Sequence, residues 1–213
     1  MQLFITDYTK KNTNIIITDS ELLLQLRKVL RARIGDHIWV QSPGNETIKI
    51  RYELCIQRWD DKIVECTIIS QQEHTTSQEE KNMIVAMPNK RDKVELIVQK
   101  LTECGLNQII FWPSERSVIK ERSPKKEERL HKIIKEAVEQ SRGWKIPTLT
   151  FTTDITKYLQ NTEVIVFDKL ETRDEEQGER NKSHVTGIVG PEGGLTKKDY
   201  QQFEGANPTI MSL

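Results

Sequence analysis

The sequence predicts an α/β protein in which an open, parallel sheet follows a smaller β-rich unit. From residue 82 onward, strand-like and helix-like segments alternate. The segments 164–167 and 185–189 are continuous apolar runs, which is typical of parallel strands covered on both faces. The string Gly190-Pro191-Glu192-Gly193-Gly194 stands between the second run and a helix start. Ligands bind at such strand ends in open α/β sheets, so we expect a ligand loop there.

The first seventy residues predict a compact barrel. Apolar and β-branched runs at 15–17, 38–40, 48–56 and 63–69 read as short strands. Asp19-Ser20 opens a helical stretch, and five apolar residues of this stretch are expected on one face: Leu22, Leu23, Leu26, Val29 and Leu30.

Residues 71–81 are polar, with almost no apolar side chain, and we interpret them as a linker. This divides the chain into a domain over 1–70 and a second domain over 82–213.

The second domain begins with a strand at 83–87, and a second strand follows at 108–112. Helical spacing of apolar residues predicts helices over 93–103 and 127–141, and Gly105 stands where a helix-ending glycine belongs. Thr196 to Asp199 has the form of a capping box that opens a further helix.

Composition excludes several classes of protein. Lys and Arg together number 32, as do Asp and Glu, so nucleic-acid binding must come from a local basic patch. Three scattered cysteines and four dispersed histidines favour a reducing cytoplasm and argue against a metal site. No apolar run approaches the roughly 20 residues that span a bilayer, and the N-terminus does not resemble a signal peptide. The motifs of serine hydrolases, phosphate-loop kinases and dinucleotide-binding enzymes do not occur.

Two groups of cations are candidates for RNA binding. The first is Arg27, Lys28, Arg31 and Arg33; on a helix Arg27 and Arg31 would share a face. Contact with RNA phosphates and a merely solvated helix face explain this group equally well.

The second group, Lys90, Arg91 and Lys93, opens a helix, although helix N-termini favour anions. A phosphate contact therefore explains it better than a structural role. Arg116, Ser117 and Arg142 would extend the same surface.

Five segments, in order along nearly the whole chain, resemble the bacterial 16S rRNA uridine N3-methyltransferase family (RsmE type) of the knotted SPOUT class. They are Leu26 to Arg31 with Gly35-Asp36, Lys90 to Lys93 with Gln99 to Gly105, Glu115-Arg116-Ser117-Val118, Glu136 to Ser141, and Ile188 to Gly194. The last is the most specific match. Three positions depart from the family pattern: Gln25 replaces a usual histidine, Cys104 a common leucine, and Arg142-Gly143 inverts a usual Gly-Arg.

The resemblance implies a SPOUT-type open parallel sheet tied in a trefoil knot, preceded by a PUA-like RNA-binding barrel. It implies a homodimer that transfers methyl groups from S-adenosylmethionine to N3 of a uridine in 16S rRNA of the small ribosomal subunit. The cofactor would be held by the glycine loop and two flanking segments: Gly190, Pro191, Glu192, Gly193 and Gly194, then Phe167, Asp168, Lys169 and Leu170, and finally Met211, Ser212 and Leu213. The catalytic base is not identified. Glu192 is either an acid–base group or a brace for the loop, and we favour the brace.

The chain stops at Leu213, where the family continues with a Gly-x-Arg-Ile-Leu-Arg segment and a last helix. The chain is either cut off before this segment or continues with a tail that is not observed, and we favour these two explanations over a third, a protein that cannot bind the cofactor normally. Two alternatives remain open: a non-catalytic RNA-binding protein of the same fold, and a methyltransferase of this fold acting on another RNA atom.

Overall fold

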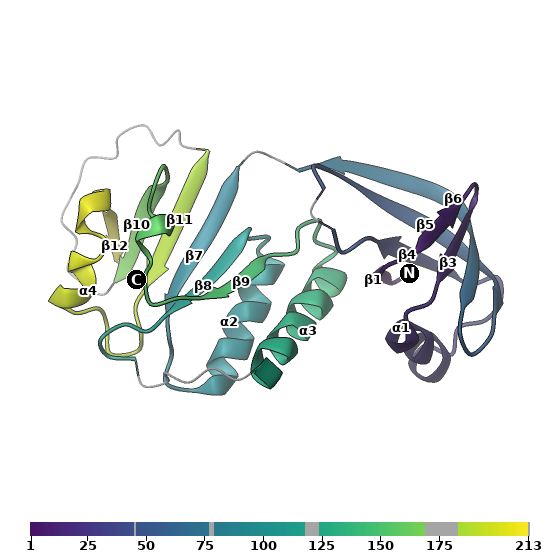
Figure 1. Cartoon of the computed structure of the whole chain (residues 1–213), viewed down its shortest axis with the longest axis horizontal. Helices are drawn as coiled ribbons and strands as arrows, with labels where there is room; N and C mark the ends of the chain where they lie inside the picture. The colour runs from purple at the N-terminus through teal and green to yellow at the C-terminus, as the bar shows by residue number, and fades with distance from the viewer. Residues whose placement is uncertain (45, 77–78, 118–123, 169–182, 213) are drawn as a thin grey trace. The chain divides into compact units, whose positions relative to one another are not determined.

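The computed structural model describes residues 1–44, 46–76, 79–117, 124–168 and 183–212, with the side chain of Arg91 excepted. The chain forms two compact units. Unit 1 comprises Met1–Thr76 and Val138–Trp144, and unit 2 comprises Ser77–Ala137 and Lys145–Leu213. Both units contain a six-stranded sheet (Figure 1), so the α/β class expected from the sequence is confirmed.

Unit 1 is built on a sheet with the strand order β1-β4-β5-β6-β3-β2. Only β1 and β4 pair in parallel, and the other neighbours are antiparallel. The strands are β1 (Leu3–Ile5), β2 (Thr9–Lys11), β3 (Asn14–Ile17), β4 (His37–Gln41), β5 (Ile48–Trp59) and β6 (Val64–Thr75). The core of the unit is made by alternate residues of these strands, among them Phe4, Ile15, Val40, Leu54 and Val64.

The helix of unit 1 is shorter than expected and changes its pitch. The Asp19 carboxylate caps α1 (Ser20–Leu24) by accepting from the amide of Glu21 at 2.9 Å. A π-helical turn, η1 (Gln25–Val29), follows directly. One extra residue in a turn rotates the following side chains by about 100°. The prediction that Val29 and Leu30 share the buried face is therefore wrong, whereas Leu22, Leu23 and Leu26 are buried as expected.

The predicted linker is largely strand. β6 continues to Thr75, and β7 (Glu80–Ala86) begins inside the polar stretch 71–81. Backbone pairing with β5 explains the difference, since Gln71 lies opposite Tyr52 and Thr75 opposite Ile48. Main-chain hydrogen bonds hold this part of β6, so its exposed polar side chains do not interrupt it.

The end of the second long helix packs within unit 1. α3 (Pro124–Ser141) ends at Arg142, which has a left-handed φ of 54°. The Glu139 carboxylate accepts from the amide of Ile5 at 2.8 Å. The Arg51 guanidinium lies 3.6 Å from the ring centroid of Trp144. Residues 138–144 are therefore part of unit 1.

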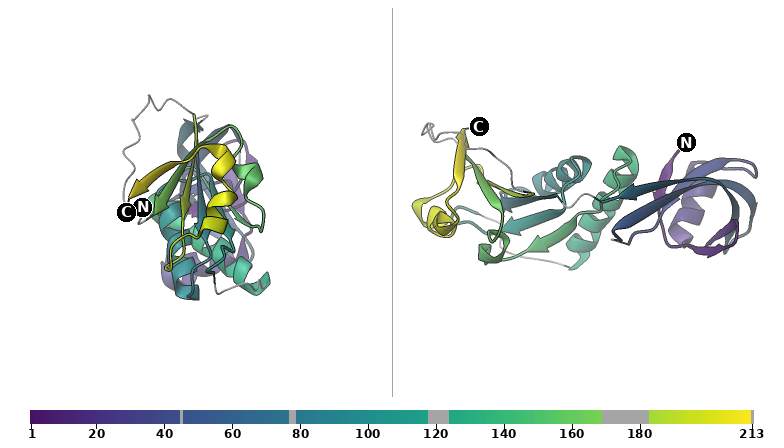
Figure 2. Two further views of the ribbon diagram at one scale, coloured as in Figure 1. Left: turned by 90° about the vertical axis from the view of Figure 1, so that its left-hand side faces the viewer. Right: turned by 90° about the horizontal axis from the view of Figure 1, so that it is seen from above.

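Unit 2 contains an entirely parallel sheet, as the apolar runs predict. Its order is β12-β10-β11-β7-β8-β9. Besides β7 the strands are β8 (Gln108–Trp112), β9 (Thr148–Phe151), β10 (Glu163–Asp168), β11 (His184–Val189) and β12 (Thr209–Ser212). Figure 2 shows the two sheets from two further directions. All six carboxyl ends meet at one edge of the sheet, where Phe167 pairs with both Val189 and Met211.

Helices cover both faces of the unit 2 sheet. Right-handed crossovers place α2 (Arg91–Glu103) and α3 on one face and α4 (Lys197–Gln201) on the other. α2 and α3 lie side by side (Figure 1), joined by an ion pair between Arg129 and Glu95. Two 3-10 turns, η2 (Thr156–Tyr158) and η3 (Glu204–Ala206), lie in the loops of the sheet. Gly105 follows α2 with a φ of 74°, as expected for a helix-ending glycine.

Candidate functional site

A cavity of about 500 Å³ opens at the carboxyl ends of β7, β10 and β11. This volume lies within the range of small-molecule sites, roughly 300–1,000 Å³. Its polar lining comprises Lys93 on α2, Asp168 at the end of β10, and Glu192 in the glycine loop. Its apolar lining comprises Val85, Ala86, Pro88, Ile97, Phe167 and Val189. The cavity lies at the strand ends where the glycine string predicts a ligand loop.

The glycine loop lines the cavity with main chain. The amide of Gly194 donates to the carbonyl of Pro191 at 2.8 Å, and Gly194 has a φ of 74°, which favours glycine. At Gly190 an added Cβ would lie 2.9 Å from Cγ of Leu195 and 3.3 Å from its nitrogen. Both glycines are therefore needed for the shape of the turn.

Glu192 joins the glycine loop to the start of α2. Its Oε1 accepts from Lys93 Nζ, and its Oε2 accepts from the amide of Asn89 at 3.3 Å. The hydrogen bond from Lys93 is the main cause that lowers the pKa of the Glu192 carboxyl. A carboxylate stabilised in this way is a weak base, which supports the bracing role.

Two further contacts from the loop after β8 reach the glycine loop and the start of α4. The Arg116 guanidinium donates to the carbonyl of Gly193. Asp199 is buried and accepts from the amide of Glu115 at 2.9 Å, while its other oxygen accepts from the amide of Thr196 at 2.9 Å. The expected capping box of Thr196 and Asp199 is confirmed. Asp199 and Glu115 are 84 residues apart in the sequence, and the local sequence pattern does not indicate their contact.

The Asp168 carboxylate lines the cavity and accepts from a neutral side chain. The Tyr200 hydroxyl donates to Asp168 Oδ2 at 2.8 Å. Burial, followed by this hydrogen bond, raises the pKa of the Tyr200 phenol, so the phenol remains a donor at neutral pH. Asp168 itself is only 8% exposed. Tyr200 was not anticipated, although its position one residue after the capping box could have drawn attention to it.

Some of the other expected cofactor residues lie beside the strand end that lines the cavity. β12 brings Met211 beside Phe167 and Ser212 beside Asp168, but neither lines the cavity among the described residues. Lys169, Leu170 and Leu213 lie outside the described residues.

The expected RNA-binding residues of unit 2 do not form one exposed group. Lys90 is exposed immediately before α2, whereas the Lys93 side chain lines the cavity. The side chain of Arg91 is outside the description. Ser117 is buried, and its hydroxyl lies 2.9 Å from that of Ser114. A direct contact of Ser117 with RNA is therefore inconsistent with the structure.

The remaining candidates belong to unit 1. Arg27 pairs with Asp61 and donates to the carbonyl of Asp60 at 2.8 Å. The helical expectation for Arg31 is wrong, because η1 ends at Val29 and Arg31 has a left-handed φ of 51°. Lys28 and Arg33 are exposed. Arg142 is also exposed and donates to the carbonyl of Met1 at 3.1 Å.

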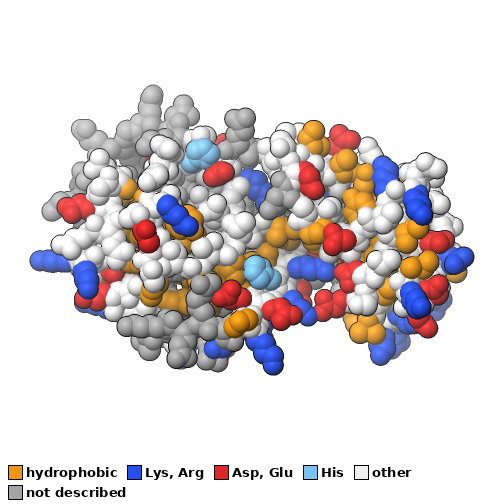
Figure 3. All heavy atoms as spheres, in the orientation of Figure 1, with side chains coloured by type: hydrophobic (Ala, Val, Ile, Leu, Met, Phe, Trp, Pro, Cys, Tyr) orange, Lys and Arg blue, Asp and Glu red, His pale blue; other side chains and the backbone are white. Residues whose placement is uncertain are grey.

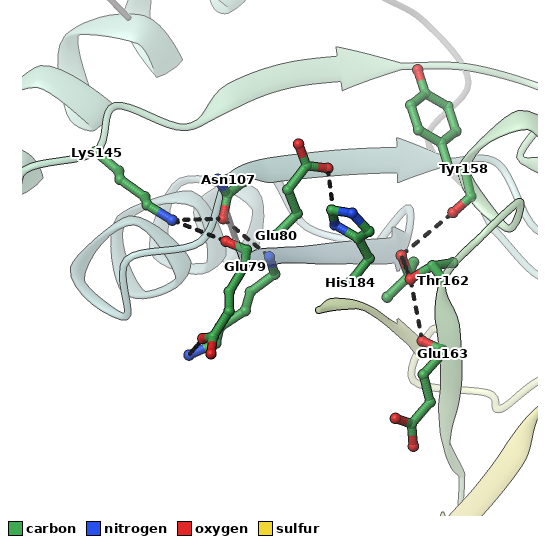
Figure 4. A network of polar contacts seen from close by, with 10 residues as sticks. Glu79, Glu80, Asn107, Lys145, Tyr158, Thr162, Glu163 and His184 are labelled. Carbon is green, nitrogen blue, oxygen red and sulfur yellow. Dashed lines mark hydrogen bonds and ion pairs between the residues drawn. The ribbon is translucent and has the colours of Figure 1, made fainter. Parts of the chain in front are cut away.

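A separate polar network lies at the amino ends of strands in the unit 2 sheet (Figure 4). Lys145 Nζ donates to the carbonyl of Glu79 at 3.2 Å and to Asn107 Oδ1 at 3.3 Å. His184 Nδ1 lies 3.8 Å from Glu80 Oε2. These contacts connect the starts of β7, β8, β9 and β11, at the edge opposite the cavity.

Within the described ranges, no cluster of three His, Cys, Asp or Glu residues has the arrangement of a metal site. None of the described helices has both the length and the apolar character needed to cross a bilayer.

Comparisons with known proteins agree on one family. A family model described as an RNA methyltransferase domain matches residues 75–213. The chain is 28% identical over 223 residues to ribosomal RNA small subunit methyltransferase E of Bacillus subtilis, covering 95% of this chain and 85% of the relative. A hypothetical protein of known crystal structure is 26% identical with a TM-score of 0.78, over 99% of this chain and 89% of the other. A ribosomal RNA small subunit methyltransferase E from Neisseria gonorrhoeae, bound to S-adenosyl methionine, has a TM-score of 0.81 at 18% identity, over 100% of this chain and 89% of the other.

Proposed function

Because the chain belongs to the RNA methyltransferase domain family, we propose that it uses S-adenosylmethionine to methylate N3 of a specific uridine in 16S rRNA. The cavity at the carboxyl ends of β7, β10 and β11 is the observation that carries this proposal. The Bacillus subtilis relative is named as a small subunit methyltransferase, and the Neisseria gonorrhoeae relative was crystallised with S-adenosyl methionine.

The described residues suit this cofactor chemically. The cofactor is a cation with a purine ring, and the cavity combines apolar walls with two carboxylates and one ammonium group. Glu192 is paired with Lys93, and the Asp168 carboxylate, which accepts from Tyr200, lines the cavity beside them. At Gly190 a side chain would collide with Leu195, so the main chain of the loop stays accessible to a ligand.

The main catalytic contribution of the protein is to position the methyl donor and the uridine. S-adenosylmethionine supplies a methyl group that is already electrophilic on its sulfonium. The chain supplies a rigid wall around it, in which Tyr200 orients Asp168, and Lys93 with Arg116 fixes the glycine loop. Holding two reactants in line is worth up to about 7–11 kcal/mol of the barrier.

The uridine must be unpaired when it reacts. Its N3 carries a proton in the base pair, so the base has to leave the stack before N3 can approach a methyl donor. The same proton must be lost, and a base or a cation that stabilises the developing negative charge would assist. We assign Glu192 to bracing, because Lys93 and the amide of Asn89 already occupy its oxygens.

We extend the proposal to the architecture. Residues 1–70 would form a PUA-like RNA-binding barrel, residues 71–81 the connection, and residues 82–213 a SPOUT domain whose chain is knotted. The protein would act as a cytoplasmic homodimer. The likeness in fold to a methyltransferase of this kind over the whole chain supports this architecture. Arg27, Lys28, Arg31 and Arg33 would contact rRNA in unit 1, and Lys90, Arg91 and Arg116 would do so in unit 2.

The test is methyl transfer from labelled S-adenosylmethionine to unmodified small ribosomal subunits, followed by digestion of the RNA and identification of the nucleoside. We expect N3-methyluridine. A ribose-methylated nucleoside would redirect the proposal to another atom, and cofactor binding without transfer to any RNA would contradict it. In the same assay Glu192→Gln should keep near-normal turnover. Loss of turnover with unchanged cofactor affinity would make Glu192 catalytic.

A further inference from the structure

Residues 24–34 of unit 1, here called the 24–34 surface, expose aliphatic side chains among cations. The exposed fraction is 52% for Leu24, 72% for Val29, 40% for Leu30 and 64% for Ile34. Lys28, Arg31 and Arg33 are exposed between them. In the lower right of Figure 3, hydrophobic, cationic and acidic side chains lie close together over the region of α1. Single exposed aliphatic residues are ordinary, but four in eleven residues call for a reason.

The backbone itself turns these aliphatic groups outward. A regular α-helix through residue 30 would carry Val29 and Leu30 on the buried face with Leu22 and Leu26. The π-helical turn η1 removes them from that face, and the amide of Leu30 donates to the carbonyl of Gln25 at 3.0 Å. Turns of this kind occur frequently at functional sites.

Two further features fix the end of the segment. Arg31 has a left-handed φ of 51°, a conformation that costs a non-glycine residue roughly 1 kcal/mol. Ile34 is held outward by the next turn, in which the amide of Gly35 donates to the carbonyl of Ile56 at 2.8 Å. The exposed aliphatic groups are therefore presented on a fixed backbone.

The charges of this surface favour a polyanion. Arg27 is engaged with Asp61, but Lys28, Arg31 and Arg33 have no ion pair with any residue that the structure describes. Three such cations within six residues attract phosphates. A protein partner would need a matching acidic and apolar cluster, whereas RNA supplies phosphates at every nucleotide.

We infer that the 24–34 surface binds a non-helical segment of the RNA substrate, with the cations on phosphates and the aliphatic side chains on unstacked bases. This inference rests on the proposed function. An RNA duplex hides its base faces and offers phosphates and ribose hydroxyls, which leave Val29 and Ile34 without apolar partners. Single-stranded and bulged RNA exposes base faces, and contact with them neutralises no phosphate, so it should add nothing to the salt dependence of binding.

The test compares two RNA probes and two kinds of variant in the full-length chain. A labelled 20-nucleotide single strand and the matching blunt duplex are titrated by fluorescence anisotropy at several salt concentrations. The aliphatic variant is Val29→Ser with Ile34→Ser, and the charge variant is Lys28→Gln with Arg31→Gln. Ile69→Ser is the matched control, because Ile69 is 52% exposed on β6 and lies outside the 24–34 surface.

We expect the aliphatic variant to bind the single strand about 10-fold more weakly, with an unchanged salt slope and unchanged duplex binding. The charge variant should lower the slope of log affinity against log salt by about 0.7 per removed phosphate contact. Unchanged affinity of the aliphatic variant would overturn the inference and assign these side chains to a protein partner. Equal loss for single strand and duplex would overturn it as well.

The proposed function fails in a distinguishable way. If the unaltered chain binds neither S-adenosylmethionine nor either RNA, the function itself is contradicted. If it binds both and the aliphatic variant does too, only the inference fails. Calorimetric titration with S-adenosylmethionine and the melting temperature of each variant show that unit 2 remains folded.

Discussion

Asp199 connects the helix that follows the glycine loop to the loop after β8, so its removal should cost much more than a helix cap. Its carboxylate accepts from the amide of Glu115 at 2.9 Å and from the amide and hydroxyl of Thr196 at 2.9 and 3.0 Å. The residue is 1% exposed, and water cannot replace these bonds. Asp199→Ala leaves two amide donors without an acceptor, at about 1–3 kcal/mol each. With the lost hydroxyl contact we expect a destabilisation of about 3–5 kcal/mol.

Thr196→Val is the matched control for Asp199→Ala. It keeps the shape of the side chain and removes only the hydroxyl, which accepts from the amide of Asp199 at 3.2 Å. Loss of such a cap costs about 1 kcal/mol. The difference between the two variants therefore measures the two amide bonds that Asp199 accepts, from Glu115 and from Thr196, separately from the contacts of the Thr196 hydroxyl.

Urea unfolding followed by circular dichroism gives both free energies. The melting temperature should fall on the order of 10 °C for Asp199→Ala and about 3 °C for Thr196→Val. Equal losses of 1 kcal/mol in both variants would refute the reasoning, because Asp199 would then act as a cap alone. Calorimetric titration with S-adenosylmethionine should show weaker binding for Asp199→Ala than for Thr196→Val, since the loop that lines the cavity loses its support.

Three further predictions concern other parts of the chain. Gly190→Ala should cost about 1–3 kcal/mol and weaken cofactor binding, because its Cβ meets Leu195; Gly205→Ala, whose Cβ meets nothing within 4 Å, should do neither in the same unfolding and calorimetric titrations. Arg142→Gly should raise the unfolding free energy by about 0.5–1 kcal/mol, because φ is 54° there, and unchanged stability would contradict this. Burial and the neighbouring Cys55 raise the pKa of the Cys66 thiol from 9.0 to about 12, so the unfolded chain loses this proton at a lower pH than the folded chain. The contribution of Cys66 to the free energy of unfolding should therefore be complete below pH 9 and fall towards pH 12. In urea titrations across that range, the free energy of unfolding of Cys66→Ala should depend less steeply on pH.

Apolar periodicity was enough to predict the sheet of unit 2. Continuous runs such as 164–167 and 185–189 are buried or half-buried on both faces, so their side chains alone identify them as parallel strands. β9 was missed because it is a four-residue strand at the edge of the sheet, with one paired side and half-buried residues. The extension of β6 was missed because main-chain pairing, rather than side-chain polarity, decides the state of residues 71–75.

The site was predictable where one short string determines the backbone, and not where distant segments meet. Gly190 to Gly194 identified the cavity, because a tight turn at a strand end needs glycine and faces the ligand edge of the sheet. Lys93 was read as a phosphate contact, since nothing in the order of residues shows that Glu192, 99 positions later, would accept from it. Likewise, the sequence does not show that Tyr200 would donate to Asp168, because only the crossover from β11 through α4 to β12 brings the two side chains together. A cavity whose polar side chains come from three segments must take its electrostatics from such distant pairs. The same cation therefore contributes to a loop brace here and would bind phosphate if Glu192 were absent.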